Sequence, residues 1–184
     1  MNFAIIESKR KKLENIKKTY PEAVIIDVTS QGEQPWVRFS PFYPHGNIPI
    51  PFSPEHYAES VEGIWQGLKV FEQENIDVTK FSVKTMKNLK RTVRTHGKVL
   101  GHRKGINGQE LLSYAEARHK IYLPVYKWVL DNSLNAEIKQ LQELNQNRDI
   151  VLLDYETNNS VTNLSKPLSH AFLVKCYIES SWPK

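Results

Sequence analysis

Three polar side chains that could do chemistry recur along a short stretch of the sequence. Glu62, Gln66 and Lys69 are spaced four and three residues apart, so on a helix they form one line, with Trp65 at its border. A carboxylate can exchange a proton with a substrate, and an indole can stack on a flat ring. The line is therefore a candidate active-site wall. The same spacing also occurs on an ordinary solvated helix face, and spacing alone leaves both interpretations open.

The element that must carry this line is a helix predicted over Ser53–Glu74. Ser53 is a favourable N-cap, and Pro54 suits the first helical position because its missing N–H would have no partner there. Apolar side chains at helical spacing predict one buried face beside the polar line. They are Tyr57, Val61, Ile64, Trp65, Leu68 and Phe71.

The segment that leads into this helix is rich in proline, which cannot donate to a strand ladder. Its prolines are Pro41, Pro44, Pro49, Pro51 and Pro54. We expect an ordered, extended loop here. The aromatic residues Phe42, Tyr43 and Phe52 suit either a plug in the core or a stacking surface for a ligand.

Basic residues are concentrated in one segment. Between Val78 and Gln109 there are nine lysines and arginines and no carboxylate, whereas the rest of the chain has 16 basic and 20 acidic residues. This asymmetry predicts a polyanionic partner, either nucleic acid, with DNA favoured, or a phosphorylated nucleotide. The candidate phosphate-binding residues are Lys87, Lys90, Arg91, Arg94, Lys98, Arg103 and Lys104.

The same segment contains four of the eight glycines, at Gly97, Gly101, Gly105 and Gly108. Glycine lets backbone N–H groups approach an anion closely, so residues 96–109 could form a phosphate-contacting loop. They could equally form a flexible, solvated connection.

A second group of carboxylates follows a predicted strand. Asp149–Tyr155 is apolar and β-branched, and Asp154 and Glu156 lie at its end, a favoured place for chemistry. Asp154 could alternatively cap the turn at residues 157–159.

The remaining patterns predict a predominantly helical α+β fold with a small β-sheet, in a single domain over residues 1–184. Two further strands are expected at Ala23–Thr29 and Trp36–Phe39. A short strand that passes into a helix is expected over Phe81–Arg94. The other predicted helices are Ile5–Lys18, Leu111–Leu134 with a kink or a new start at Pro124, Ala136–Gln146 and a buried Pro167–Ile178.

Several classes of protein are disfavoured. The six histidines form no HExxH or paired-ligand spacing, and the single Cys176 excludes a cysteine-based zinc site, so we expect neither metal nor cofactor. No GxSxG nucleophile motif and no Walker loop is present. No apolar run is long enough for a membrane span, and the N-terminus is unlike a secretory signal, so a cytoplasmic protein is expected.

Two motifs in the first half resemble the NADAR (NAD- and ADP-ribose-associated) superfamily. The order Ser40-x-Phe42-Tyr43-Pro44, followed by Val61-Glu62-x-x-Trp65-Gln66-x-Leu68-Lys69, is similar to that family's SxFYP-like loop and VEHxYQxxK-like helix. Tyr114-x-x-x-Arg118 and the Asp154 region follow in roughly the family's order. The family's C-terminal WG and GxNxLG signatures are not legible, which is typical of a divergent member.

The resemblance implies hydrolysis of an N-glycosidic bond, for which a modified or ADP-ribosylated base in nucleic acid is the favoured substrate. Glu62 matches the catalytic glutamate, and Asp154 would be the second acid. Lys69 would hold a phosphate or the departing group, with Gln66 and Arg118 as further substrate contacts and Trp65 or Tyr43 as a base-stacking ring. The alternative is a non-catalytic nucleic-acid-binding module on a decayed enzyme scaffold.

Overall fold

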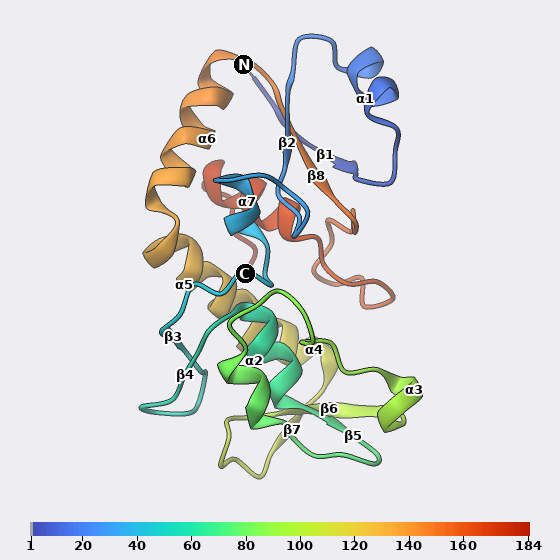
Figure 1. Cartoon of the computed structure of the whole chain (residues 1–184), viewed down its shortest axis with the longest axis vertical. Coiled ribbons are helices and arrows are strands. Elements are labelled where there is room, and N and C mark those ends of the chain that lie inside the picture. Colours follow the sequence, from blue (N-terminus) through green and yellow to red (C-terminus); the bar gives the residue numbers. More distant parts are fainter. Residues whose placement is uncertain (1) are drawn as a thin grey trace. The chain divides into compact units, whose positions relative to one another are not determined.

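The computed structural model describes residues 2–184, and it confirms the α+β class (Figure 1). Contacts between residues divide the chain into two compact units. The first comprises the residues up to Ser40 together with Leu134–Lys184, and the second comprises Pro41–Ser133. The second unit is thus inserted, in sequence, between two halves of the first. None of the helices within residues 2–184 is long and apolar enough to cross a membrane.

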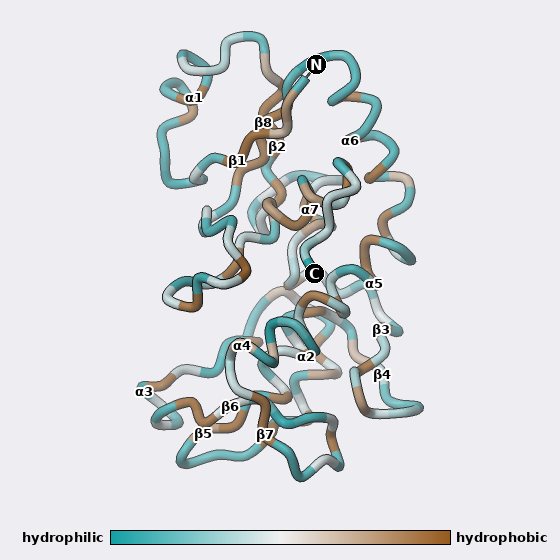
Figure 2. The backbone as a smooth tube through the Cα atoms, turned by 180° about the vertical axis from the view of Figure 1, so that it is seen from behind, coloured by the Kyte–Doolittle hydropathy of each residue, from teal (hydrophilic) through white to brown (hydrophobic). Residues whose placement is uncertain are grey.

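The first unit is built on a parallel sheet with the strand order β1-β8-β2, in which β8 pairs with both neighbours. All five residues of β8 are buried, and Figure 2 shows the hydrophobic stretch along this strand. A strand covered on both faces needs a nearly continuous apolar run, as the sequence IVLL provides. The elements of this unit are β1 Ala4–Ser8, α1 Leu13–Thr19, β2 Val24–Asp27, a 3₁₀ helix Trp36–Phe39, α6 Asn135–Asn147, β8 Ile150–Asp154 and α7 His170–Ile178.

The two faces of β8 are covered by different helices. Ile16 of α1 packs against Val151 and Leu153. Because side chains alternate along a strand, Asp154 points to the opposite face, where it accepts hydrogen bonds from residues at the start of α7. Helix α7 is buried nearly all round, as its apolar sequence predicts, and Cys176 lies in its buried part.

Several elements of the first unit differ from the prediction. The helix predicted over Ile5–Lys18 is wrong in its first half, because Ala4–Ser8 pairs with β8 and α1 begins only at Leu13. The segment Trp36–Phe39 forms a 3₁₀ helix instead of a strand. The predicted strands at β2 and β8 and the helices at α6 and α7 are confirmed.

The second unit contains an antiparallel hairpin and a small antiparallel sheet with the order β5-β6-β7. Helix α2 packs against the 3₁₀ helix Val78–Ser82, and Gly67 allows this contact because a Cβ there would lie 2.2 Å from the Phe81 ring. The elements are β3 Ile48–Pro49, β4 Tyr57–Ala58, α2 Val61–Leu68, β5 Lys69–Phe71, the 3₁₀ helix, α3 Val93–His96, β6 Val99–Arg103, β7 Leu111–Leu112, α4 Tyr114–Ala117, a π-helical turn Arg118–Tyr122 and α5 Leu123–Ser133.

The predicted start of the central helix is wrong. Helix α2 begins at Val61, where the Ser60 hydroxyl caps it by accepting from the Gly63 N–H at 3.0 Å. Ser53, the predicted cap, is buried in the β3–β4 hairpin and accepts from the Ile106 N–H at 2.9 Å. The helix also ends earlier than predicted, because Lys69 turns into an extended conformation and opens β5.

Three later segments differ in part from the prediction. The strand expected within Phe81–Arg94 is absent, because the chain there leaves the 3₁₀ helix and runs without regular structure. The helix expected after it is only the short α3, which begins at Val93. The glycine-rich residues 96–109 include strand β6. The helix predicted over Leu111–Leu134 is confirmed from Tyr114 to Ser133, where α4, the π-helical turn and α5 follow one another without a break, and the π-helical turn ends two residues before Pro124. Only its predicted start is wrong, because Leu111–Leu112 forms β7.

Candidate active site

Gln66 organises the polar line on α2. Its Oε1 accepts from the Lys69 ammonium at 3.3 Å and from the Arg91 backbone N–H at 3.1 Å. Two donors on one oxygen fix the orientation of the amide, so its Nε2 must face Glu62, to whose Oε1 it donates at 2.7 Å. The predicted line of Glu62, Gln66 and Lys69 therefore exists as a hydrogen-bonded chain.

Glu62 is buried, which distinguishes this line from a solvated helix face. Burial raises the pKa of Glu62 above its usual value, while the hydrogen bond from Gln66 and the charges of Lys69 and Lys90 act in the opposite direction. Among residues 2–184, no donor is hydrogen-bonded to its second oxygen, Oε2. Glu62 thus keeps one oxygen fixed and one available.

Lys69 lies at the end of the chain of hydrogen bonds. Its ammonium is largely buried, and burial lowers its pKa. The negative charge of Glu62 opposes this shift, whereas the positive charges of Arg91 and Lys90 add to it. The pKa values of Glu62 and Lys69 are therefore displaced towards each other, as is typical of groups that transfer protons near neutral pH.

Arg91 contacts the C-terminal end of α2. Its guanidinium is buried and donates to the carbonyls of Gln66 at 2.9 Å, Lys69 at 2.7 Å and Asn75 at 2.6 Å. These bonds join the C-terminal end of α2 to the loop at Asn75. They give Arg91 an internal role, although it is among the predicted phosphate-binding residues.

Trp65 is surrounded by rings. The centroid of the His102 ring lies 3.8 Å from that of Trp65, and Tyr114 and Tyr122 lie 5.9 and 5.6 Å away. One face of the indole is therefore occupied by the protein itself. Tyr114 also contacts Arg118, because the buried Arg118 guanidinium donates to the Tyr114 hydroxyl at 3.0 Å. The predicted substrate contacts Trp65 and Arg118 thus share one aromatic cluster.

His102 is a further member of the candidate site, and no sequence motif indicates it. Strand β6 brings it opposite Lys69 of β5, so its position depends on a pairing that sequence spacing does not predict. Burial and the nearby charge of Lys69 lower its pKa to about 3, so the ring is neutral at physiological pH. The Trp65 backbone slightly favours the protonated form, but neither ring nitrogen has a partner in hydrogen-bonding geometry within the described part of the chain.

The proline-rich motif loop lies against the first turn of α2. The Pro41 carbonyl accepts from the Glu62 N–H at 2.9 Å, which joins the two resembling motifs directly. Lys90 lies 5.6 Å from the centroid of the Phe42 ring and acts electrostatically on Glu62. The Tyr43 ring is half-buried and lies 4.8 Å from that of His45.

The predicted phosphate-binding residues divide into two groups. Arg103 donates to Gln109 and Asn75, and Lys104 pairs with Glu110 at 2.7 Å, so these side chains contact their own loop. The second group is exposed to solvent and available to a polyanion, and it consists of Lys87, Lys90, Arg94 and Lys98. Arg91 belongs to neither group, because it is buried.

Asp154 belongs to the first unit and has its own partners. Its Oδ2 accepts from the Ser169 hydroxyl at 2.8 Å and from the Ala171 N–H at 3.2 Å, and it pairs with His170 Nδ1 at 3.0 Å. Burial alone would raise the pKa of Asp154, but the charge of His170 and these hydrogen bonds lower it. Glu156 lies 4.0 Å from Arg10. The carboxylate of Asp154 thus ties the end of β8 to the start of α7.

No group of three histidine, cysteine, aspartate or glutamate side chains that could hold a metal ion occurs among residues 2–184. A comparison with curated proteins gives no match. The model of a family of unknown function (DUF6939) matches residues 8–174, a range that includes every residue of the candidate site. Because this match covers most of the sequence, the chain belongs to the DUF6939 family.

Proposed function

We propose that this protein hydrolyses an N-glycosidic bond in a nucleotide-type substrate, with a modified or ADP-ribosylated base in nucleic acid as the favoured substrate. The observation that carries the proposal is the state of Glu62. It is a buried carboxyl group with a raised pKa, one oxygen fixed by Gln66 and the other without a hydrogen-bond partner among residues 2–184. The likeness of the two motifs to the NADAR superfamily supports the same chemistry.

The chemistry of the bond fits such a carboxyl group. Breaking the link between a ribose carbon and a base leaves positive charge on the sugar and negative charge on the departing base. A protonated Glu62 can give its proton to the base, and the carboxylate that remains can stabilise the sugar cation or activate water. Gln66 holds Glu62 in one orientation throughout, and the Lys69 ammonium supplies a positive charge for a phosphate or the departing group.

The surroundings of Glu62 support a nucleotide as the substrate. The aromatic rings of Tyr43 and Tyr114 are partly accessible for stacking on a base. Lys87, Lys90, Arg94 and Lys98 are exposed cations from a segment without carboxylates, which favours a polyanion over a neutral nucleoside.

The test compares wild-type protein with Glu62→Gln on DNA that carries ADP-ribosylated bases and on the corresponding free nucleotides. Released base and sugar are separated by chromatography and identified by mass spectrometry. We expect the substitution to lower the rate about a hundredfold to ten-thousandfold, because an amide cannot donate or accept the proton. Glu59→Gln is the matched control, since Glu59 lies just before α2 and, among the charged side chains of residues 2–184, pairs only with Lys84, at 4.0 Å. Equal rates for wild type and Glu62→Gln would refute the role of Glu62.

The second candidate is a nucleic-acid-binding module without catalysis, favoured by the exposed cations alone. It predicts binding that weakens steeply with salt and no product from any of these substrates. Product release that depends on Glu62 would exclude it.

A further inference from the structure

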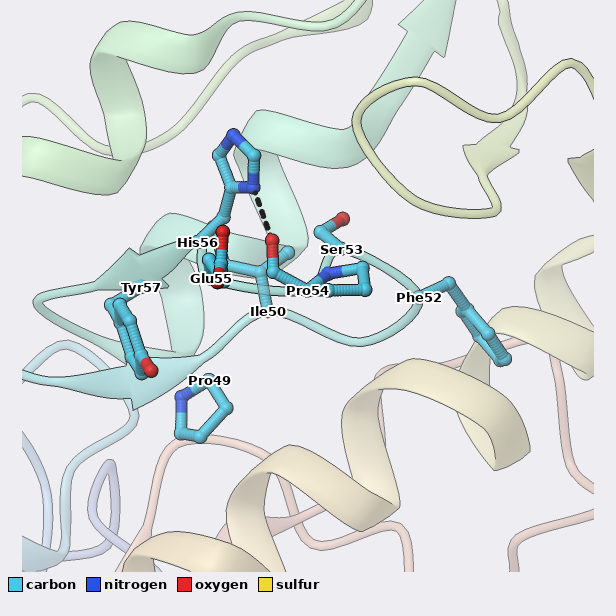
Figure 3. Close-up of a pocket in the computed structure, with 8 residues that line it drawn as sticks. All are labelled: Pro49, Ile50, Phe52, Ser53, Pro54, Glu55, His56 and Tyr57. Carbon is cyan, nitrogen blue, oxygen red and sulfur yellow. Dashed lines mark hydrogen bonds between the residues drawn. The ribbon is translucent and has the colours of Figure 1, made fainter.

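The β3–β4 hairpin forms an open pocket of about 310 Å³, whose lining comes entirely from residues 49–57 (Figure 3). This volume lies at the lower end of the range of about 300–1,000 Å³ that is usual for small-molecule sites. The hairpin is separate in sequence from Glu62 and takes no part in the chemistry proposed above.

The loop of the hairpin is held in one conformation. The Ile50 N–H donates to the His56 carbonyl at 3.0 Å, and the His56 N–H donates to the Ser53 carbonyl at 3.1 Å. Phe52 and Glu55 both adopt a left-handed backbone, with φ of 56° and 63°, which is costly for residues with a side chain. Gly105 packs so closely against this loop that a Cβ there would lie 2.2 Å from the Phe52 carbonyl oxygen. The loop is therefore a rigid support.

This rigid support presents aromatic rings to solvent. Phe52 is 49% exposed and Tyr57 is 59% exposed, although both are bulky residues that proteins tend to bury. Figure 3 shows the two rings at opposite ends of the loop, with Pro49 beside Tyr57, its partner across the two strands. Two exposed rings on a preorganised loop lose little entropy when they stack on a ligand.

We propose that the β3–β4 hairpin binds unpaired bases of a single-stranded nucleic acid, which stack on Phe52 and Tyr57. The inference rests on the proposed function in one respect, since it specifies the form of nucleic acid that the enzyme takes as its substrate. It also places a contact with the polymer outside the reaction centre.

Charges around the hairpin fit this ligand. The Lys104 ammonium lies 5.5 Å from the centroid of the Phe52 ring and comes from the segment without carboxylates, so a backbone phosphate can lie beside a stacked base. Lys104 donates one hydrogen bond to Glu110, which anchors its position, and the other donors of its ammonium can bind a phosphate. His56 Nδ1 bonds to the Pro54 carbonyl, which leaves Nε2 for a ligand. Together with the Glu55 carboxylate it suits the amino groups of base edges.

The test measures the binding of a fluorescently labelled single-stranded oligonucleotide, and of the duplex of the same sequence, by anisotropy at one fixed salt concentration. We expect wild type to prefer the single strand. The double variant Phe52→Ala, Tyr57→Ala should bind it at least about tenfold more weakly, because stacking on a ring is lost at two positions. The double variant Phe52→Tyr, Tyr57→Phe keeps both rings and should retain wild-type affinity. Phe3→Ala, which removes another exposed phenyl ring, should also bind as wild type does.

The outcomes separate this inference from the proposed function. Circular dichroism checks that each variant is folded, which is expected because both rings are exposed. Unchanged affinity in the double alanine variant, or a wild type that prefers the duplex, would overturn the hairpin as a base-stacking site even if Glu62-dependent hydrolysis is observed. Ring-dependent binding without any hydrolysis would uphold the hairpin and refute the glycosidase instead.

Discussion

The side chain of Gln66 links a carboxylate, an ammonium and a backbone N–H. Its oxygen accepts from Lys69 and from the Arg91 backbone, and its nitrogen donates to Glu62, so no other orientation satisfies all three bonds. A hydrogen bond to the charged form of an acid favours that form. Gln66 therefore limits how far burial can raise the pKa of Glu62. Positioning and pKa control reside in the same amide.

Replacing the Gln66 amide should change the pKa of Glu62 although Glu62 itself is not mutated. In Gln66→Leu the carboxyl group stays buried but loses its donor, so we expect the pKa of Glu62 to rise further. The buried Arg91 N–H also loses its acceptor, which should lower the free energy of unfolding by about 1–3 kcal/mol. The pKa is measured by NMR titration of the Glu62 carboxyl carbon, and stability by urea denaturation. Gln73→Leu, at an exposed glutamine, is the control; a Glu62 pKa that stays constant or falls in Gln66→Leu would contradict the argument.

At the scale of elements, local patterns predicted what depends on neighbouring residues and failed where distant pairing decides. The runs AVIID and IVLL identify β2 and β8 because buried parallel strands have a composition of their own. The residues AIIES resemble a helix start until β8, more than 140 positions later, pairs with them. The predicted N-cap at Ser53 is wrong for a similar reason. Ser53 and Ser60 both precede apolar residues, and only the pairing of β3 with β4 rules out a helix that begins at Ser53.

The candidate site follows the same division. The spacing of Glu62, Gln66 and Lys69 lies within or directly after one helix, so the sequence predicts their alignment. Their burial could not be predicted, because it depends on the motif loop and on strand β6. His102 could not be found at all, since its contact with Trp65 arises from the pairing of β5 with β6.

The two arginines Arg91 and Arg94 illustrate how the element decides a residue's role. Arg91 binds the carbonyls at the end of α2, whereas Arg94, in α3, is exposed. We expect Arg91→Leu to lower the free energy of unfolding by about 2–4 kcal/mol, because buried carbonyls lose a charged donor. Arg94→Leu should change it by less than about 0.5 kcal/mol and instead weaken binding to DNA.

Both arginine variants are measured by urea denaturation and by DNA binding at several salt concentrations. The decisive comparison is the salt dependence, because removing a phosphate contact reduces the slope of log K against log salt by about one. A reduced slope in folded Arg91→Leu with unchanged stability would contradict its internal role.

At the scale of the whole molecule, the first unit is completed only by the last part of the chain. Strand β8 lies between β1 and β2, which are both translated long before it. The unit is then held by His170 at the start of α7, which bonds through Nε2 to the Val28 carbonyl at 2.8 Å and pairs through Nδ1 with Asp154. One imidazolium thus joins the ends of β2 and β8 to α7.

This arrangement predicts a pH dependence of stability. Burial opposes protonation of His170, but the charge and hydrogen bond of Asp154, the Val28 carbonyl and the more distant Asp27 raise its pKa above the usual 6.5. A raised pKa in the folded state means that the stabilisation is complete below pH 6.5 and is lost as the pH rises through the folded-state pKa. The lowered pKa of Asp154 has the opposite sign, so its stabilisation is complete above pH 3.8 and is lost as the pH falls through its folded-state pKa.

We therefore expect the pair to contribute most between these two values and to weaken above pH 6.5 by about 1.4 kcal/mol for each pH unit up to the folded-state pKa of His170. Urea denaturation of wild type and His170→Gln across this range measures the effect. The variant should be less stable than wild type at about pH 5, and the difference should shrink as the pH rises through the folded-state pKa of His170, because wild type then loses the charged pair. His119→Gln removes an exposed histidine and should follow the wild-type curve. A difference between wild type and His170→Gln that is constant with pH would show that His170 acts through packing alone.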